Sequence, residues 1–133
     1  MTSIAFSFSG QRNNEYAKNV PGGFESMAQP IPPFMEKGSK GPHTLIPQLV
    51  ACGAGYGKDI VFDGNYGDVT AGAMSQLQAR NGIDTDGSCG PETRRTMKHR
   101  YNVDFEKACR LIPGTTIFIQ PDGSEIPWSP DND

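Results

Sequence analysis

The stretch DGNYGDVTAGAM at residues 63–74 recurs as DGSCGPETRRTM at residues 86–97. Asp, Gly, Gly, Thr and Met match between the two copies at a constant offset of 23 positions. Each copy begins with an Asp-Gly turn, continues to a glycine at a helix entry and places a threonine in the first helical turn. The repeat therefore predicts two similar turn-and-helix units that share one core.

Each residue type in the repeat has a structural role. The aspartate carboxylate can accept backbone N–H bonds across its own turn, and the glycines adopt backbone angles that a Cβ would forbid. The threonine is expected to satisfy an unpaired donor in the first helical turn, and the methionine to point into the shared core. We therefore predict structural turn residues at Asp63, Gly64, Gly67, Thr70, Asp86, Gly87, Gly90 and Thr93.

Helix signals surround and continue the repeat. Residues 43–53 predict a short helix with Pro47 in its first turn and glycines after its end. Residues 69–81 carry apolar or small side chains at helical spacing and end on an Asn-Gly pair, which favours a helix stop. Pro91 is typical of a first helical position, so a third helix is predicted from there to about residue 101. Residues 104–110 could add a short turn of helix.

The last part of the chain has the pattern of a β-hairpin. Residues 115–119 are β-branched and aromatic, residues 121–123 read Pro-Asp-Gly, and residues 124–128 supply a return strand. A two-stranded hairpin is marginally stable by itself in water. We therefore expect it to pack on the helices or to add to the sheet edge of a neighbouring molecule.

Composition divides the chain into three segments. It contains 16 glycines and 11 prolines and only 35% hydrophobic residues, and most of its prolines lie near its two ends. We predict an extended Pro/Gly-rich arm at residues 1–42, a helical domain at residues 43–110, and a hairpin with an acidic tail at residues 111–133. The isolated aromatic residues of the two outer segments are predicted to dock on a partner: Phe6, Phe8, Phe24, Phe34, Phe118 and Trp128.

Charge and cysteine patterns exclude several classes of partner. The net charge of −3 comes without a broad basic face, so no nucleic-acid partner is expected. The three cysteines show no CxxC spacing, so we expect no metal site and free buried thiols. No stretch has the length of a membrane span, and the N-terminal residues lack the pattern of a signal peptide, so neither a membrane association nor a signal peptide is expected.

No residue pattern predicts catalysis. Residues 83–87 resemble part of a calcium loop but lack acids at the required positions. A nucleophile built from Cys89 and His99 lacks an orienting group, and Asp84 and Asp86 lie in a tight turn where capping is the simpler role. We therefore expect a protein that is not an enzyme and uses no cofactor.

Residues 61–97 resemble the peptidoglycan-binding domain of bacterial and phage cell-wall hydrolases. That family's pattern is a DGxFGxxT turn, an AVxxFQxxNGL helix and a second DGxxGPxT turn, which these residues follow in order. The resemblance covers roughly residues 43–101 and implies a mainly α fold with a small three-helix bundle. Two positions depart from it: Cys89 replaces a common large apolar residue, and Arg100 stands where a core aromatic is expected.

Two functions are compatible with these patterns. In the first, the bundle binds peptidoglycan, with candidate glycan contacts at Tyr56, Tyr66, Gln78, Asn81, Arg94 and Lys98, although Tyr66 also fits a side chain that covers a turn. In the second, the arms hold the bundle among other structural proteins of a phage virion, as a capsid decoration or tail component. We predict the second, a non-catalytic peptidoglycan-binding-like protein in the virion, or in the cytoplasm before assembly. The alternative is a free cell-wall-binding accessory module of a lysis or wall-remodelling system.

Overall fold

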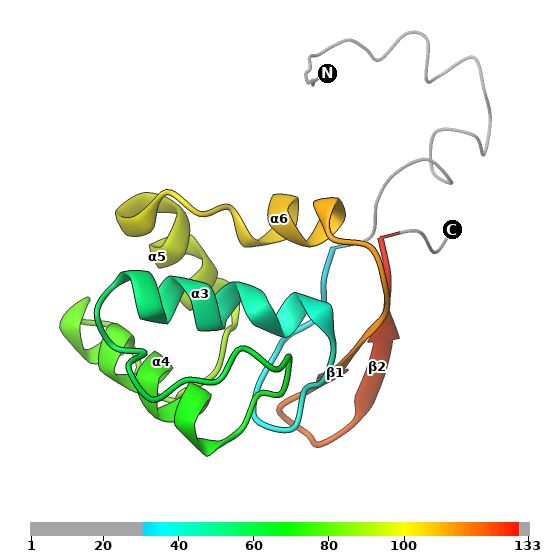
Figure 1. Ribbon diagram of the computed structural model, residues 1–133, viewed down its shortest axis with the longest axis horizontal. Helices are drawn as coiled ribbons and strands as arrows, with labels where there is room; N and C mark the ends of the chain where they lie inside the picture. The colour runs from blue at the N-terminus through cyan, green and yellow to red at the C-terminus, as the bar shows by residue number, and fades with distance from the viewer. Residues whose placement is uncertain (1–30, 131–133) are drawn as a thin grey trace, which may run out of the picture. The chain divides into compact units, whose positions relative to one another are not determined.

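Four α-helices and a β-hairpin follow one another along residues 31–130, the part of the chain that the computed structural model describes (Figure 1). Helix α3 packs against α4 and α6, and α5 packs against α6. No helix among these residues is long and apolar enough to cross a membrane. In chain order the elements are the 3-10 turn η2 (Pro42–Thr44), α3 (Leu45–Gly53), α4 (Asp68–Arg80), α5 (Pro91–Tyr101), α6 (Phe105–Leu111), β1 (Thr116–Ile119) and β2 (Glu125–Trp128).

The helix boundaries agree with the local signals. Helix α4 stops at Arg80, and Gly82 follows with a φ of 70°, a left-handed angle that ends a helix and that glycine adopts without strain. Helix α5 begins at Pro91 as predicted. Helix α6 is a real fourth helix, because the Asp104 carboxylate accepts the Lys107 backbone N–H at 3.1 Å and caps its first turn. The mainly α fold with a C-terminal hairpin is confirmed.

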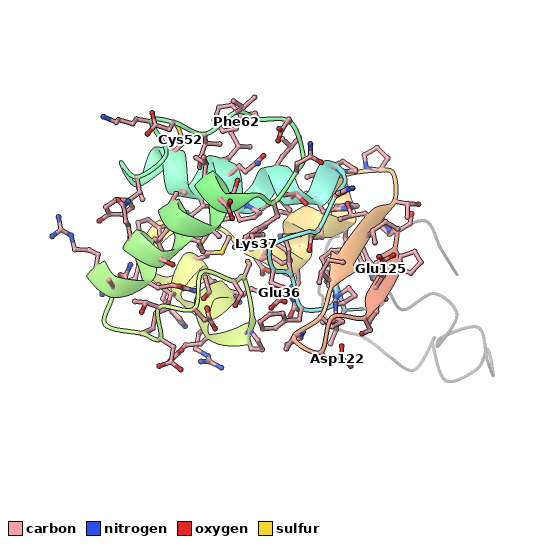
Figure 2. All side chains as sticks on the ribbon, turned by 90° about the horizontal axis from the view of Figure 1, so that it is seen from below. Glu36, Lys37, Cys52, Phe62, Asp122 and Glu125 are labelled. Atoms are coloured by element: carbon pink, nitrogen blue, oxygen red, sulfur yellow. The ribbon has the colours of Figure 1, made fainter. Side chains whose placement is uncertain are left out.

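The two copies of the repeat share one core. Their methionines, Met74 and Met97, are both completely buried, together with Leu77 of α4 and Cys89 between the two helices. The Cys89 thiol lies 3.8 Å from the Met97 sulfur. Cys52, by contrast, lies exposed at the end of α3 (Figure 2). Core packing therefore explains why the methionine recurs in the repeat.

The two Asp-Gly turns have the geometry that the repeat predicts. The Asp63 carboxylate accepts the Asn65 backbone N–H at 2.9 Å, and in the second copy Asp86 makes the same bond to the residue two positions on at 3.0 Å. The glycines that follow, Gly64 and Gly87, have φ values of 74° and 75°. These left-handed angles strain any residue with a Cβ, so the dipeptide is a requirement of the backbone.

Residues 34–41, called the strap below, bind the two repeats together through their backbone. Met35 is completely buried and exchanges two backbone hydrogen bonds with Cys89. Further along the strap, the Tyr66 N–H donates to the Ser39 carbonyl at 2.9 Å. Tyr66 and Cys89 occupy equivalent positions in the two copies of the repeat. The strap thus makes backbone contacts with the same site in each unit.

The strap also reaches the hairpin. Lys40 and Ile117 exchange two backbone hydrogen bonds, of 3.0 Å and 2.8 Å, so one strap residue pairs with the edge of β1. Residues 31–130 consequently belong to one compact unit by contact. The boundaries at residues 42 and 110 stay a prediction, and the Lys40–Ile117 hydrogen bonds cross both of them.

The hairpin packs on its own chain through aromatic side chains. Phe118 is completely buried and Trp128 is 5% exposed, and both rings lie against the His43 imidazole. His43 Nε2 lies 2.8 Å from the Ile112 carbonyl, which can only accept, so Nε2 carries the proton and Nδ1 accepts from the Thr116 hydroxyl at 2.6 Å. The prediction that Phe118 and Trp128 dock on a partner is therefore wrong, because they form the hairpin's attachment to the helices.

The outer edge of β2 is poorly suited to pairing with another strand. In the antiparallel register Ile117 of β1 lies opposite Pro127 of β2. Both backbone groups of Ile117 bond to Lys40, on the side away from β2. By the alternation of antiparallel pairs, the backbone of Pro127 then also faces away from β1, and a proline offers no N–H there. The hairpin packs on the helices. The outer edge of β2 does not offer a neighbouring molecule a complete row of backbone donors and acceptors for strand pairing.

Candidate functional site

Two of the predicted glycan contacts lie inside the protein. Tyr66 is 2% exposed, and its hydroxyl donates to the Gly87 carbonyl at 2.6 Å. Burial raises the pKa of this phenol well above its ordinary value of 10.0. Gln78 is completely buried. Neither side chain is accessible to a glycan, so the structure contradicts their prediction as surface contacts, and Tyr66 instead covers the second Asp-Gly turn.

Two buried glutamines make equivalent contacts with the two copies of the repeat. The amide nitrogen of Gln48 in α3 donates to the Asn65 carbonyl at 3.0 Å and to the Thr70 hydroxyl at 3.1 Å. Gln78 in α4 makes the same two contacts in the second copy, at 2.8 Å each, and its amide oxygen also accepts the Gly87 N–H. The expected capping role of the threonines is wrong, because among the described residues their hydroxyls accept from glutamine and from no backbone N–H of the first helical turn.

Tyr56 and Asn81 are half-buried and hydrogen-bonded within the chain. Arg80 Nε donates to the Tyr56 hydroxyl at 3.2 Å. The Asn81 amide donates to the Leu77 carbonyl at 2.8 Å and to the Tyr101 hydroxyl at 2.9 Å. These contacts tie the end of α4 to its neighbours. Neither predicted residue shares a groove with the remaining two candidates.

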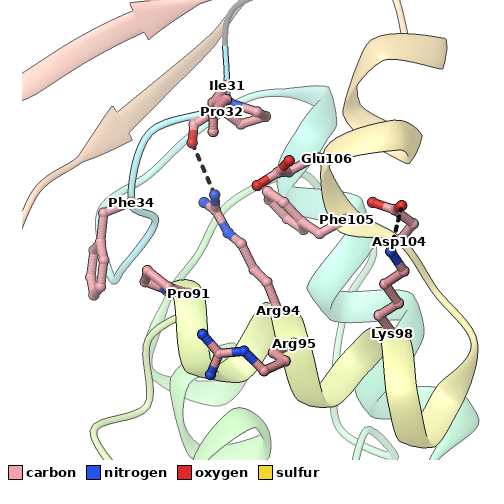
Figure 3. A pocket seen from close by; sticks show the side chains of 10 residues that line it. All are labelled: Ile31, Pro32, Phe34, Pro91, Arg94, Arg95, Lys98, Asp104, Phe105 and Glu106. Atoms are coloured by element: carbon pink, nitrogen blue, oxygen red, sulfur yellow. Dashed lines mark hydrogen bonds and ion pairs between the residues drawn. The ribbon is translucent and has the colours of Figure 1, made fainter. Parts of the chain in front are cut away.

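Arg94 and Lys98 do lie together, in a groove of about 420 Å³ between three segments of the chain (Figure 3). One wall is α5, the second is the start of α6, and the third is the chain entering the strap. The groove is lined by Ile31, Pro32, Phe34, Pro91, Arg94, Arg95, Lys98, Asp104, Phe105 and Glu106. We take this α5–α6 groove as the candidate functional site.

Arg94 holds the groove together. Its guanidinium donates to the Pro32 carbonyl at 2.9 Å and also to the Pro33 carbonyl, which ties the third wall to α5 (Figure 3). The same guanidinium lies 4.1 Å from the centre of the Phe105 ring, a cation–π contact with the second wall. Arg94 thus has a structural role in the groove, and its charge is already engaged by the protein.

The rim of the groove carries charges of both signs. Lys98 on α5 and Asp104 at the start of α6 form an ion pair at 3.8 Å, with 64% and 41% of their side chains exposed. Arg95 is exposed on α5, and Glu106 is half-buried on α6. Among the described residues neither Arg95 nor Glu106 forms an ion pair. The groove therefore presents one open cation and one open carboxylate on facing elements.

Sequence reasoning found only part of this groove. The spacing of Arg95 and Lys98 places both on one side of a helix, and this signal was visible in the basic run of α5. Phe34, Phe105 and Glu106 come from two other segments, and no local pattern marks them as neighbours of α5. Within the described part of the chain no group of three or more His, Cys, Asp or Glu side chains could hold a metal ion.

Phe34, a predicted docking residue, lies against its own chain. Its ring packs where a Cβ on Gly90 would stand, which explains the glycine at the entry to α5. The equivalent Gly67 has no neighbour within 4 Å of such a Cβ. Phe6, Phe8 and Phe24 lie outside the described residues.

Comparison with protein families gives one match. Residues 48–97 match the model of the family described as “putative peptidoglycan binding domain”. The matched segment contains both copies of the repeat, and it ends inside α5, so Lys98, the start of α6 and the chain before the strap lie outside it. The resemblance noted from the sequence is thereby confirmed for this segment. Neither the curated proteins nor the solved structures contain a match to the chain.

Proposed function

We propose, with the peptidoglycan-binding domain at residues 48–97 as the premise, that the chain is a non-catalytic cell-wall-binding module. The observation that carries the proposal is the match of both repeats to that domain family. The module would attach to peptidoglycan through the α5–α6 groove, and the chain would act at the cell wall.

Charge supports this choice of groove. Peptidoglycan carries carboxylates on its peptide stems, and Arg95 and Lys98 are exposed cations on the α5 wall. A second groove, between α3, α5 and α6, is lined by residues such as Leu49, Val103 and Ile112 and has no charged lining residue. An apolar groove gives a hydrated, acidic polymer no ionic partner, so the α5–α6 groove fits the ligand better.

A virion location has less support. It rested on aromatic residues that would dock the two arms on other proteins. Phe118 and Trp128 belong to this chain's own core, and Phe34 packs against Gly90. None of the predicted docking aromatics among the described residues is therefore free to bind another protein. A free accessory module of a lysis or wall-remodelling system agrees better with these contacts.

The surroundings of Cys89 support a non-catalytic role. Its thiol is completely buried, and burial raises its pKa to about 11. His99, the other half of the nucleophile considered from the sequence, is exposed on α5. A buried neutral thiol without access to solvent cannot attack a substrate in the groove.

Co-sedimentation of the full chain with purified cell-wall sacculi tests the proposal. We expect retention in about 50 mM salt and weaker retention in about 500 mM salt, because exposed charges are screened. The double variant Arg95→Glu/Lys98→Glu should lose most of the binding. Arg100→Glu is the matched control, because Arg100 is exposed on the same helix but does not line the groove. No retention of the unaltered chain in low salt would refute the proposal.

A further inference from the structure

We infer that the α5–α6 groove recognises the charged peptide stem of peptidoglycan and not its sugar strand, with a ligand carboxylate at Arg95 and a ligand ammonium group at Glu106. This inference rests on the proposed function and specifies its ligand. Two of the three walls lie outside the matched family segment, so this ligand choice is a property of this chain's own additions to the domain.

The first argument is the placement of the charges. Arg95 belongs to α5 and Glu106 to α6, and both side chains line the same groove (Figure 3). The Lys98–Asp104 pair shows that α5 and α6 come close enough to join charges directly at one end of the groove. Because Arg95 and Glu106 have no ion-pair partner among the described residues, a ligand with charges of both signs can bind between them.

The second argument is the lack of a fully open aromatic face among the rings that line the groove. Proteins commonly bind sugars on the exposed face of an aromatic ring. The Phe105 ring is 1% exposed and is covered by the Arg94 guanidinium at 4.1 Å. The Phe34 ring packs against Gly90. The Phe105 ring is thus occupied by the protein itself, and the half-buried Phe34 ring has one side against Gly90, which disfavours stacking of a neutral sugar there.

The third argument is the chemistry of the stem. A peptidoglycan peptide stem carries free carboxylates and, where it is not cross-linked, the free amino group of a diamino acid. These two groups match the open cation and the open carboxylate of the groove. A neutral sugar strand would leave both Arg95 and Glu106 without an ionic partner, while the stem satisfies both.

Competition on the full chain distinguishes the two ligands. Sacculi-bound protein is challenged with a muramyl tetrapeptide that has a free diamino-acid amine, with the same peptide after N-acetylation, and with an N-acetylglucosamine tetramer. We expect release by the free peptide, about fivefold weaker release by the acetylated peptide, and none by the oligosaccharide, because a single exposed ion pair contributes about 1 kcal/mol.

Variants then test which residue binds the ligand ammonium group and which binds the ligand carboxylate. Glu106→Gln should abolish the difference between the free and acetylated peptides, while Arg95→Gln should weaken both about equally. Arg100→Gln is the matched control, and circular dichroism checks that each variant is folded. Release by the oligosaccharide, or an undiminished preference for the free amine in Glu106→Gln, would overturn the inference. Failure of the unaltered chain to bind sacculi would instead refute the proposed function itself.

Discussion

Replacing Gln78 by methionine should destabilise the protein by about 3 kcal/mol, although methionine is an unbranched side chain of similar length. The Gln78 amide nitrogen contacts the Asp86 carboxylate, the Ser88 carbonyl and the Thr93 hydroxyl, and its oxygen accepts the Gly87 N–H. An amide has two N–H donors, so these contacts amount to two full donated bonds and one accepted bond.

The magnitude follows from what the substitution leaves behind. Each of the two donated bonds contributes about 1 kcal/mol, and leaving the buried Gly87 N–H without a partner costs at least about 1 kcal/mol, which gives about 3 kcal/mol in all. Gln48 is the matched comparison, because it makes two of the equivalent contacts and its buried oxygen has no partner. Removing that unpaired oxygen offsets part of the loss, so Gln48→Met should cost about 2 kcal/mol less than Gln78→Met.

Equilibrium unfolding in urea, followed by circular dichroism, measures both effects. Gln76→Met serves as the control, because Gln76 is exposed on the same helix and its substitution should change the free energy of unfolding by no more than about 0.5 kcal/mol. A cost for Gln78→Met equal to that of Gln48→Met, or indistinguishable from that of Gln76→Met, would refute the reasoning.

Three further predictions use the same structure. Gly90→Ala should destabilise the protein by about 1–3 kcal/mol in urea unfolding, because its Cβ would displace the Phe34 ring, whereas Gly67→Ala at the equivalent position should have almost no effect; equal costs would contradict this explanation. Thiol titration of the native protein at about pH 8 should detect Cys52 alone, because burial raises the pKa of the Cys89 thiol to about 11 and that of the Cys109 thiol to about 12. Reaction of more than one of the three thiols before denaturation would show that the core opens. Burial opposes ionisation of Asp86, but hydrogen bonds to its carboxylate outweigh this effect and hold its pKa below the ordinary 3.8. The unfolded chain therefore binds more protons than the folded one, and this contribution to stability is lost as the pH falls below that value. Asp86→Asn should flatten the decline in urea midpoint between about pH 5 and about pH 2.5, and an unchanged decline would count against this contribution.

Local signals were sufficient for the regular elements. Pro91 marks the first residue of α5, and the Asn-Gly pair after α4 coincides with its end. The Pro-Asp-Gly turn at residues 121–123 correctly separates β1 from β2. Each of these signals depends on the backbone preferences of the residues themselves, which is why the sequence alone predicts them.

Contacts between distant segments were not predictable in this way. Met35 stands among prolines and glycines and has no periodic apolar neighbours, so it was assigned to an extended arm, yet it is completely buried against the second repeat. Phe118 and Trp128 were interpreted as docking residues because they are isolated aromatic residues in an outer segment of the chain. Their place is provided by His43, whose polar ring is buried through hydrogen bonds at both nitrogens.

The candidate site shows the same division. Of the cationic wall, the sequence predicted Lys98 but not Arg95, although the helical spacing of the two places them on one side of α5. The acidic wall could not be inferred, because Glu106 lies beside α5 only as a result of the turn that joins α5 to α6. The buried Gln78 was mistaken for a surface contact for a similar reason, since an amide in a helix carries no local sign of whether it faces a repeat turn or solvent.

The strap has a consequence for the order of events during synthesis. A ribosome releases residues 34–41 before it has made two of their partners, at positions 89 and 117. At about 5–20 residues per second, the strap would wait roughly 4–15 seconds for β1 to emerge. During that interval the backbone groups of Lys40 remain exposed to solvent and to other nascent chains. The segment translated among the earliest is therefore among the last to find its native contacts.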